Sequence, residues 1–190
     1  LYPCNCSRHD IAAAASAPQE GTKPPLGPDG LIYPGTCRNS HDRTGPLPQN
    51  TALRLDMQAA ARALSFMETG SGPEGQTGQI DISASDLITN VGDIVLSRRD
   101  FPGSYHLSVV LDDAAQNITH VSRGQDLCEA TKIHVLLQNI LGLPIPIYQH
   151  HKLIRDDNGK RLAKRDDARA ITKYRADGCS PSDIRAMIDL

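Results

Sequence analysis

The sequence predicts an α/β fold, because segments with a strand pattern alternate with segments with a helix pattern after residue 90. Residues 105–112 (YHLSVVLD) place β-branched side chains at the centre of an apolar run, which predicts a buried strand. Residues 118–123 (ITHVSR) predict a second strand. Residues 127–141 space their apolar side chains as an amphipathic helix does, and Gly142 with Pro144 ends that helix.

Shorter segments on either side predict the remaining elements. Residues 52–57 (ALRLDM) alternate apolar and polar side chains like a half-buried strand, and residues 58–68 are compatible with a short helix. Further expected elements are strands at 80–82, 93–97 and 145–153, a Gly-rich loop at 69–78, a charged turn at 155–159, a helix at 166–176, and a last helix that Ser180 opens and Ile188 ends.

The composition limits what kind of protein this is. A length of 190 residues suits one domain, or one domain with a small appendage. The net charge of −2 gives no global basic signal, so any contact with a nucleic acid would depend on a local patch. No apolar run approaches the roughly 20 residues that span a bilayer, and no signal-peptide pattern opens the chain. We therefore expect a cytoplasmic protein with reduced cysteines.

Three cysteines predict a metal site near the N-terminus. Cys4 and Cys6 lie on one short turn, and Cys37 follows a Pro-Gly pair beyond a segment rich in Ala, Pro and Gly. Three thiolates are one ligand short of a closed tetrahedral zinc site. The residue types alone leave the fourth ligand open among three neighbours, which are His9, His41 and Tyr33.

The two cysteine-bearing segments resemble the zinc motif of the glutamyl-tRNA synthetase family. That motif reads CxC followed by Tyr-x-x-x-Cys, and the segments YPCNCSR and IYPGTCR fit it. The resemblance implies one structural Zn²⁺ bound by Cys4, Cys6, Tyr33 and Cys37. It favours Tyr33 as the fourth ligand over the histidine that general ligand chemistry prefers.

Residues 105–127 (YHLSVVLDDAAQNITHVSRGQDL) show the most specific resemblance. They look like the family's run Tyr-x-(Leu/Phe)-Ala-x-Val-Val-Asp-Asp…Ile-Thr-His-Val-x-Arg-Gly-x-Asp-Leu. The resemblance implies that Tyr105 and Arg123 line a glutamate pocket. The chemistry agrees, because arginine binds a carboxylate through two parallel hydrogen bonds and tyrosine adds a hydroxyl donor.

Residues 161–165 (RLAKR) resemble the KMSKS signature of class I synthetases. Lys164 takes the place of the second lysine, which contacts the ATP phosphates in the transition state, and Arg161 keeps the charge of the first. Ala163 lacks the hydroxyl of the usual serine. The resemblance implies ATP with Mg²⁺ as a substrate and Lys164 as the catalytic residue. No covalent nucleophile is expected, because such enzymes position ATP and an amino acid for in-line attack.

The resemblance also implies a domain plan, which is the second half of a class I synthetase Rossmann-type catalytic domain with a small zinc-binding insertion. We expect a zinc-binding subdomain at 1–50 with a flexible insertion at 12–32, the C-terminal half of the catalytic domain at 51–168, and a C-terminal helical segment at 169–190. No His-x-Gly-(His/Ser) sequence of the HIGH type occurs in the 190 residues. We therefore expect an incomplete part of the enzyme that is inactive by itself.

The C-terminal region favours one branch of this family. Only residues 166–190 follow the KMSKS-like turn, whereas a glutamyl-tRNA synthetase would continue into a large helical anticodon-binding region. The favoured branch is a short paralogue that activates glutamate with ATP and transfers it to the queuosine base of tRNA(Asp), a tRNA modification. Two alternatives remain, an ordinary glutamyl-tRNA synthetase that charges tRNA(Glu) and a zinc-stabilised binding module without turnover. The expected partners are tRNA(Asp), glutamate and ATP, for a monomer that does not contact a membrane.

Overall fold

The structure is a computed structural model that describes residues 1–16, 24–39, 45–46, 48–155, 158–160, 162 and 170–188. It divides the chain into two compact units, Leu1–His151 and Lys152–Leu190. Within the described ranges, no helix combines the length and the apolar character that crossing a membrane requires. The three-part division expected from the sequence stays a prediction.

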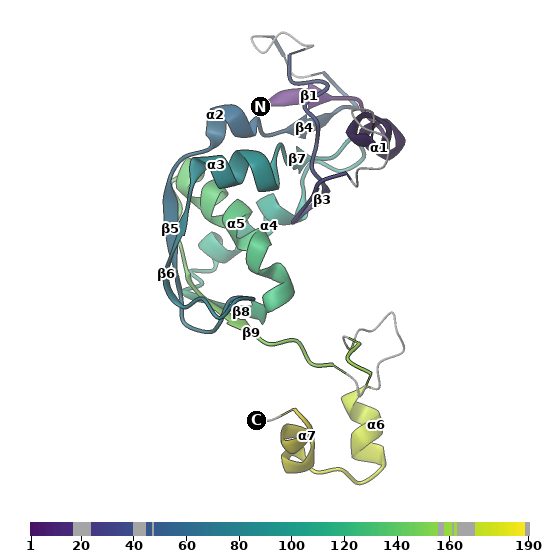
Figure 1. Cartoon of the computed structure of the whole chain (residues 1–190), viewed down its shortest axis with the longest axis vertical. Helices are drawn as coiled ribbons and strands as arrows, with labels where there is room; N and C mark the ends of the chain where they lie inside the picture. The colour runs from purple at the N-terminus through teal and green to yellow at the C-terminus, as the bar shows by residue number, and fades with distance from the viewer. Residues whose placement is uncertain are drawn as a thin grey trace. The chain divides into compact units, whose positions relative to one another are not determined.

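The first unit contains a four-stranded mixed sheet that lies along one side of helix α5 (Cys128–Leu141; Figure 1). Its strands lie in the order β6 (Gly78–Ile82), β5 (Leu64–Glu68), β9 (Ile147–His151) and β8 (His120–Gly124). Strands β5 and β6 form an antiparallel hairpin, while β9 runs parallel to both β5 and β8. Helix α5 connects β8 to β9, so this part is a parallel β-α-β unit. The α/β prediction is confirmed.

The main core lies between this sheet and the helices that pack on it. Helix α5 buries Ile133, Leu136 and Leu137, and it contacts β5. Phe66 of β5 meets Tyr148 of β9 edge to face, with ring centroids 5.3 Å apart. Gly142 ends α5 in the left-handed conformation, as the sequence predicted, because a residue without Cβ adopts that backbone at no steric cost.

Residues 105–112 form a helix, so the predicted strand is wrong. Helix α4 spans Tyr105–Ala115 and begins at Ser104, whose hydroxyl accepts a hydrogen bond from the backbone N–H of Leu107. Its fully buried side chains, His106 and Val110, are four residues apart, and Leu111 is 45% exposed. An N-cap and a packing face with helical spacing therefore override the β propensity of two adjacent valines.

The predicted helix at 58–68 is also wrong in its second half. Helix α2 covers only Met57–Ala60, and Ala61 leaves the helical conformation with ψ at 137°. Strand β5 follows, with Phe66 and Glu68 buried on one face and Met67 exposed on the other. This alternation has the period of a strand, and residues 69–77 form the expected turn region between β5 and β6.

A second, three-stranded antiparallel sheet carries the N-terminal segment. Its strands lie in the order β1 (Tyr2–Cys4), β4 (Ala52–Arg54) and β7 (Val95–Ser97). The predicted insertion at 12–32 is structured at both of its ends, because helix α1 (Arg8–Ser16) enters it and a hairpin of β2 (Leu26–Gly27) and β3 (Gly30–Leu31) follows. Residues 17–23, the middle of that prediction, lie outside the described residues.

The remaining elements complete both units. A short helix α3 (Ala84–Asp86) continues into a π-helical turn at Leu87–Val91, and a 3₁₀ turn at Gln125–Leu127 leads into α5. In the second unit, α6 spans Ile171–Ala176 and α7 spans Pro181–Met187. Ser180 and Asp183 form a capping box at the start of α7, which confirms the predicted N-cap.

Candidate functional site

Cys4, Cys6 and Cys37 meet on one side of the three-stranded sheet. Their ligand atoms all lie within 4.8 Å of one another, and Cys6 Sγ is 3.5 Å from Cys37 Sγ. The hydroxyl oxygen of Tyr33 is 3.4 Å from the sulfurs of both Cys4 and Cys6. It also accepts a hydrogen bond of 2.8 Å from the backbone N–H of Cys37. The four residues named from the sequence therefore come together.

The spacing of these atoms matches tetrahedral zinc. Zn–S bonds of about 2.3 Å and a Zn–O bond of about 2.0 Å place sulfurs about 3.8 Å apart and sulfur about 3.5 Å from oxygen. Burial raises the pKa of Cys6 to about 11 and raises the pKa of Tyr33. Burial alone would also raise the pKa of Cys37, but hydrogen bonds from Tyr33, Asn5 and the neighbouring thiols lower it to about 7. A bound dication is the group that would allow these ligands to ionise together.

The sequence left two other ligand candidates, His9 and His41, and the structure describes only His9. His9 is exposed on α1 and belongs to no metal-binding group there. His41 lies outside the described residues. The donor set that the structure assembles is thus three sulfurs and one phenolic oxygen.

A buried carboxylate, Asp93, binds Tyr2, which packs with Cys4 and Tyr33 of the cysteine cluster. Asp93, 3% exposed, accepts hydrogen bonds from the hydroxyl of Tyr2, from Arg38 at 2.9 Å, and from the backbone N–H of Met57 at 2.7 Å. Its backbone carbonyl accepts a bond of 2.9 Å from Arg54. This role of Asp93 is not visible in the sequence, because a single aspartate before an apolar strand has many ordinary uses.

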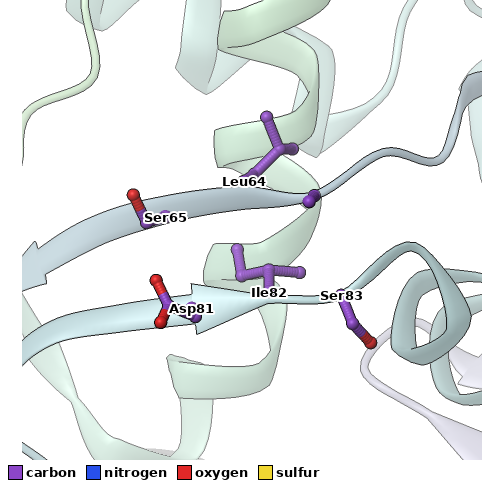
Figure 2. Close-up of a pocket in the computed structure, with 6 residues that line it drawn as sticks. Leu64, Ser65, Asp81, Ile82 and Ser83 are labelled. Carbon is purple, nitrogen blue, oxygen red and sulfur yellow. The ribbon is translucent and has the colours of Figure 1, made fainter.

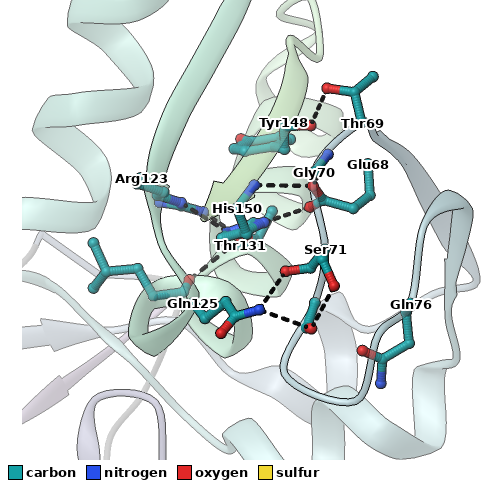
Figure 3. Close-up of polar contacts among 12 residues, drawn as sticks. Glu68, Thr69, Gly70, Ser71, Gln76, Arg123, Gln125, Thr131, Tyr148 and His150 are labelled. Atoms are coloured by element: carbon teal, nitrogen blue, oxygen red, sulfur yellow. Dashed lines mark hydrogen bonds and ion pairs between the residues drawn. The ribbon is translucent and has the colours of Figure 1, made fainter. Parts of the chain in front are cut away.

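Three side chains hold Arg123 of β8, and Figure 3 shows two of them, Thr131 and His150. Its Nε donates to Nε2 of His150 over 3.2 Å, its Nη1 donates to Nδ1 of His134 over 3.0 Å, and its Nη2 donates to the hydroxyl of Thr131. The guanidinium carbon lies 5.0 Å from the ring centroid of Tyr148. Burial lowers the pKa of Arg123. The side chain still keeps its charge at neutral pH, because the ordinary pKa of arginine is very high.

Glu68 of β5 completes this network from the neighbouring strand. Its Oε1 accepts backbone N–H bonds from Gly70 at 2.7 Å and from His150 at 2.9 Å. Its Oε2 contacts Nδ1 of His150. Burial alone would raise the pKa of Glu68, but these hydrogen bonds outweigh it and lower the pKa below the usual range. Gly70 must be glycine here, since a Cβ would lie 2.2 Å from the carbonyl oxygen of His150.

Tyr105 and Arg123 approach each other around His134. The ring of Tyr105 lies edge-on to that of His134, with centroids 5.9 Å apart. Nδ1 of His106 is 3.0 Å from Nε2 of His134. Burial, with Arg123 and His106 nearby, lowers the pKa of His134 to about 3. The two residues predicted to face glutamate are therefore brought to one place, and they are linked by a histidine that the sequence analysis did not select.

Tyr105 lines one of the cavities of the described structure. That cavity has a volume of about 780 Å³ and lies between the cysteine cluster and the start of α4. Its polar lining includes Cys6, Asp29, Arg54, Tyr105 and His106. A smaller cavity of about 390 Å³ lies at the ends of β5 and β6 (Figure 2). Asp81 is its one ionisable lining residue, so this cavity lacks the groups that a catalytic site needs.

The two residues predicted to contact ATP cannot be placed. Arg161 and Lys164 lie outside the described residues, so both stay predictions. Four polar residues around Arg123 were not predicted from the sequence, namely Glu68, Thr131, His134 and His150. Glu68 was missed because its strand was taken for a helix, and the pairing of β5 with β9 is not visible in the pattern of either strand.

Comparisons with known proteins identify the family of this chain. Residues 59–190 match the family described as tRNA synthetases class I (E and Q), catalytic domain. A glutamyl-Q tRNA(Asp) synthetase from Rhodobacter capsulatus is 60% identical over 100% of this chain and 67% of its own length. A protein of the same name from Geobacter sulfurreducens is 36% identical over 92% of this chain and 49% of its own length.

Two solved structures share the fold at low identity. A glutamate-tRNA synthetase from Elizabethkingia anophelis has a TM-score of 0.57 at 20% identity, covering 87% of this chain and 32% of its own. A glutamate tRNA ligase from Elizabethkingia meningosepticum, solved in complex with its amino acid, has the same score and coverage at 22% identity.

These matches also show how much of each relative this chain spans. The chain spans about two thirds of the Rhodobacter relative and about half of the Geobacter relative. The family match covers the mixed sheet, helix α5 and both residues predicted to face glutamate. The chain belongs to the catalytic-domain family of the class I tRNA synthetases (E and Q).

Proposed function

We propose that the protein carrying this sequence activates glutamate with ATP and transfers it to the queuosine base of tRNA(Asp). The hydrogen bonds that Arg123 makes leave donors suited to a carboxylate, and this observation carries the proposal of a carboxylate substrate. The name shared by the Rhodobacter and Geobacter relatives supports tRNA(Asp) as the acceptor. No observation on the described residues favours tRNA(Glu) over tRNA(Asp).

The hydrogen-bond inventory of Arg123 fits one carboxylate. A guanidinium has five N–H donors, and three nitrogens each make one contact, with His150, His134 and Thr131. These three contacts use three of the five N–H groups, so two remain, one on each terminal nitrogen. Such a pair matches the two oxygens of a carboxylate. We assign Arg123 to a carboxylate of glutamate and Tyr105, which is 60% exposed, to the wall of the glutamate site.

The proposed activation step needs no nucleophile from the protein. A carboxylate oxygen of glutamate attacks the α-phosphorus of ATP, the bond to the β-phosphate breaks, and pyrophosphate leaves with its electron pair. Class I synthetases use ATP with Mg²⁺, and we assign Lys164 and Arg161 to the phosphates. Catalysis then comes from positioning the reactants and from stabilising the charge that develops on the phosphates.

The proposed metal is one structural Zn²⁺ bound by Cys4, Cys6, Cys37 and Tyr33. It would link strand β1 and the turn that follows it to the segment that carries Tyr33 and Cys37. The fit of the interatomic distances to a tetrahedral site supports this assignment.

The test uses the complete gene product that carries this sequence. We expect glutamate-dependent ATP–pyrophosphate exchange, and transfer of labelled glutamate to tRNA(Asp) that contains queuosine. The same tRNA prepared without queuosine is the control and should accept no label. Charging of tRNA(Glu) without any transfer to tRNA(Asp) would assign the chain to an ordinary glutamyl-tRNA synthetase. If no amino acid supports ATP–pyrophosphate exchange, the protein is a binding module without turnover.

A further inference from the structure

Glu68, His150 and Arg123 form a line of contacts across three neighbouring strands (Figure 3). Glu68 and His150 are 2% and 1% exposed, so neither can exchange its partner for water. The contacts run from the carboxylate of Glu68 to Nδ1 of His150, and from Nε2 of His150 to Nε of Arg123. Each link therefore restricts the next one.

Arg123 decides which nitrogen of His150 carries hydrogen. A guanidinium only donates, so Nε2 of His150, 3.2 Å from Nε of Arg123, must accept and has no hydrogen. A neutral His150 then carries its hydrogen on Nδ1, which faces the carboxylate of Glu68. The carboxylate is an acceptor, so the direction of donation is the same along the whole line, from Arg123 to His150 to Glu68.

The backbone fixes the orientation of Glu68 as well. Its Oε1 accepts two backbone N–H groups, from Gly70 and His150, so an oxygen is required at that position. An amide in place of the carboxylate would keep its oxygen there and would place its NH₂ group against Nδ1 of His150. His150 would then have to accept at Nδ1 and carry its hydrogen on Nε2. Nε2–H of His150 would then face Nε–H of Arg123, another donor, and could donate only to the hydroxyl oxygen of Thr131, which lies 3.1 Å from Nε2. The hydrogen bond from Arg123 to His150 would be lost.

We propose that Glu68 and His150 are positioning residues that fix the guanidinium of Arg123 in the orientation that receives the substrate carboxylate. This inference rests on the proposed function, in which Arg123 binds glutamate. Thr131 and His134 hold the two terminal nitrogens, while the Glu68–His150 pair sets the rotation about Nε. The pair contributes to the affinity for glutamate without contacting it.

The test is Glu68→Gln in the complete gene product. We expect the KM for glutamate to rise on the order of 10- to 100-fold, as is typical when a partner that orients a binding group is lost. The KM for ATP should stay unchanged. Nitrogen-15 spectra of histidine-labelled protein should show His150 protonated at Nδ1 in the wild type and at Nε2 in the variant. A purely structural role of Glu68 would not move the tautomer and the KM for glutamate together.

Asp81→Asn is the matched control, because it makes the same carboxylate-to-amide change at an exposed position of β6. It should leave both readouts as in the wild type. An unchanged tautomer, or a changed tautomer with an unchanged KM for glutamate, would overturn the proposal. If Glu68→Gln does not fold, the wild-type spectrum decides, since hydrogen on Nε2 of His150 would contradict the donation order. A wild type without glutamate activation would instead refute the proposed function.

Discussion

Nε of Arg123 donates to Nε2 of His150 over 3.2 Å, although the two residues are 27 positions apart in the chain. The contact joins β8 to the neighbouring strand β9, and their parallel pairing places Arg123 directly opposite His150. A residue that the sequence marks as a carboxylate ligand is thus oriented by a residue that only strand pairing brings near it.

Replacement of Arg123 by lysine should damage glutamate binding while keeping the charge. Lysine cannot reproduce the fork of donors, and it leaves acceptors on His150, His134 and Thr131 without their partner. A hydrogen bond to a charged group contributes about 1.5–3 kcal/mol, so the KM for glutamate should rise by about 10- to 100-fold. Glutamate-dependent ATP–pyrophosphate exchange by the complete gene product measures this.

The control for that variant is Arg62→Lys at an exposed arginine of the same unit. It should leave the KM for glutamate unchanged. Equal behaviour of the two variants would remove Arg123 from the glutamate site.

Metal content should respond to the loss of one cysteine in the N-terminal cluster. Metal analysis of the purified protein is expected to find about one zinc per chain, as a single tetrahedral site requires. Cys37→Ser should lower that ratio and the melting temperature. Cys179→Ser, in the second unit, should change neither. Zinc content that survives Cys37→Ser would show that the assigned ligands are wrong.

Removal of the buried carboxylate of Asp93 should destabilise the N-terminal part strongly. Asp93→Ala leaves Arg38, Tyr2 and the N–H of Met57 without their acceptor. Breaking a buried ion pair from one side costs about 3–5 kcal/mol in the free energy of unfolding, which urea denaturation measures. Asp100→Ala is the comparison, because its pair with Arg98 is exposed, and it should have almost no effect. Similar losses for both would argue against the supporting role of Asp93.

Substitution of Gly70 should strain the junction between β5 and β9. The added Cβ of Gly70→Ala would lie 2.2 Å from the carbonyl oxygen of His150, so backbone atoms must shift. Overpacking of this kind costs about 1–3 kcal/mol, and the shift would also disturb the N–H groups that bind Glu68. Gly45→Ala, which meets no described atom within 4 Å, is the control for chemical denaturation. Equal stability of the two variants would contradict the close approach.

Stability should fall as the pH drops below the ordinary pKa of histidine. His134 has its pKa lowered to about 3, so the folded chain keeps this ring neutral while the unfolded chain protonates it near pH 6.5. The unfolded state then binds more protons between these two values, and the free energy of unfolding decreases with falling pH. His134 accounts for about 2 kcal/mol of loss between pH 7 and pH 5.

Denaturation of His134→Gln at both pH values isolates this contribution. The variant should lose less stability on acidification than the wild type. The control His120→Gln, at an exposed position, should keep the wild-type dependence. An acid response of His134→Gln that equals the wild type would refute the assignment.

The sequence by itself determined the family, the cysteine cluster and about half of the helices and strands. Helix α5 and strand β8 were predicted because their patterns depend on local spacing and on Gly142, both of which are read along the chain. Cys4, Cys6, Tyr33 and Cys37 were found because a metal motif requires particular residue types at short intervals. Tyr105 and Arg123 were found through resemblance, and their placement around one histidine is consistent with it.

Only the tertiary structure decided how these residues are held. The strand predicted at 105–112 became helix α4, because its N-cap and its contact with α5 outweigh the local propensity of two valines. Glu68 reaches His150 across the parallel pairing of β5 and β9, two strands separated by nearly eighty residues of chain. Such pairings depend on the packing of whole elements, whereas a sequence pattern records only the neighbours of each residue along the chain.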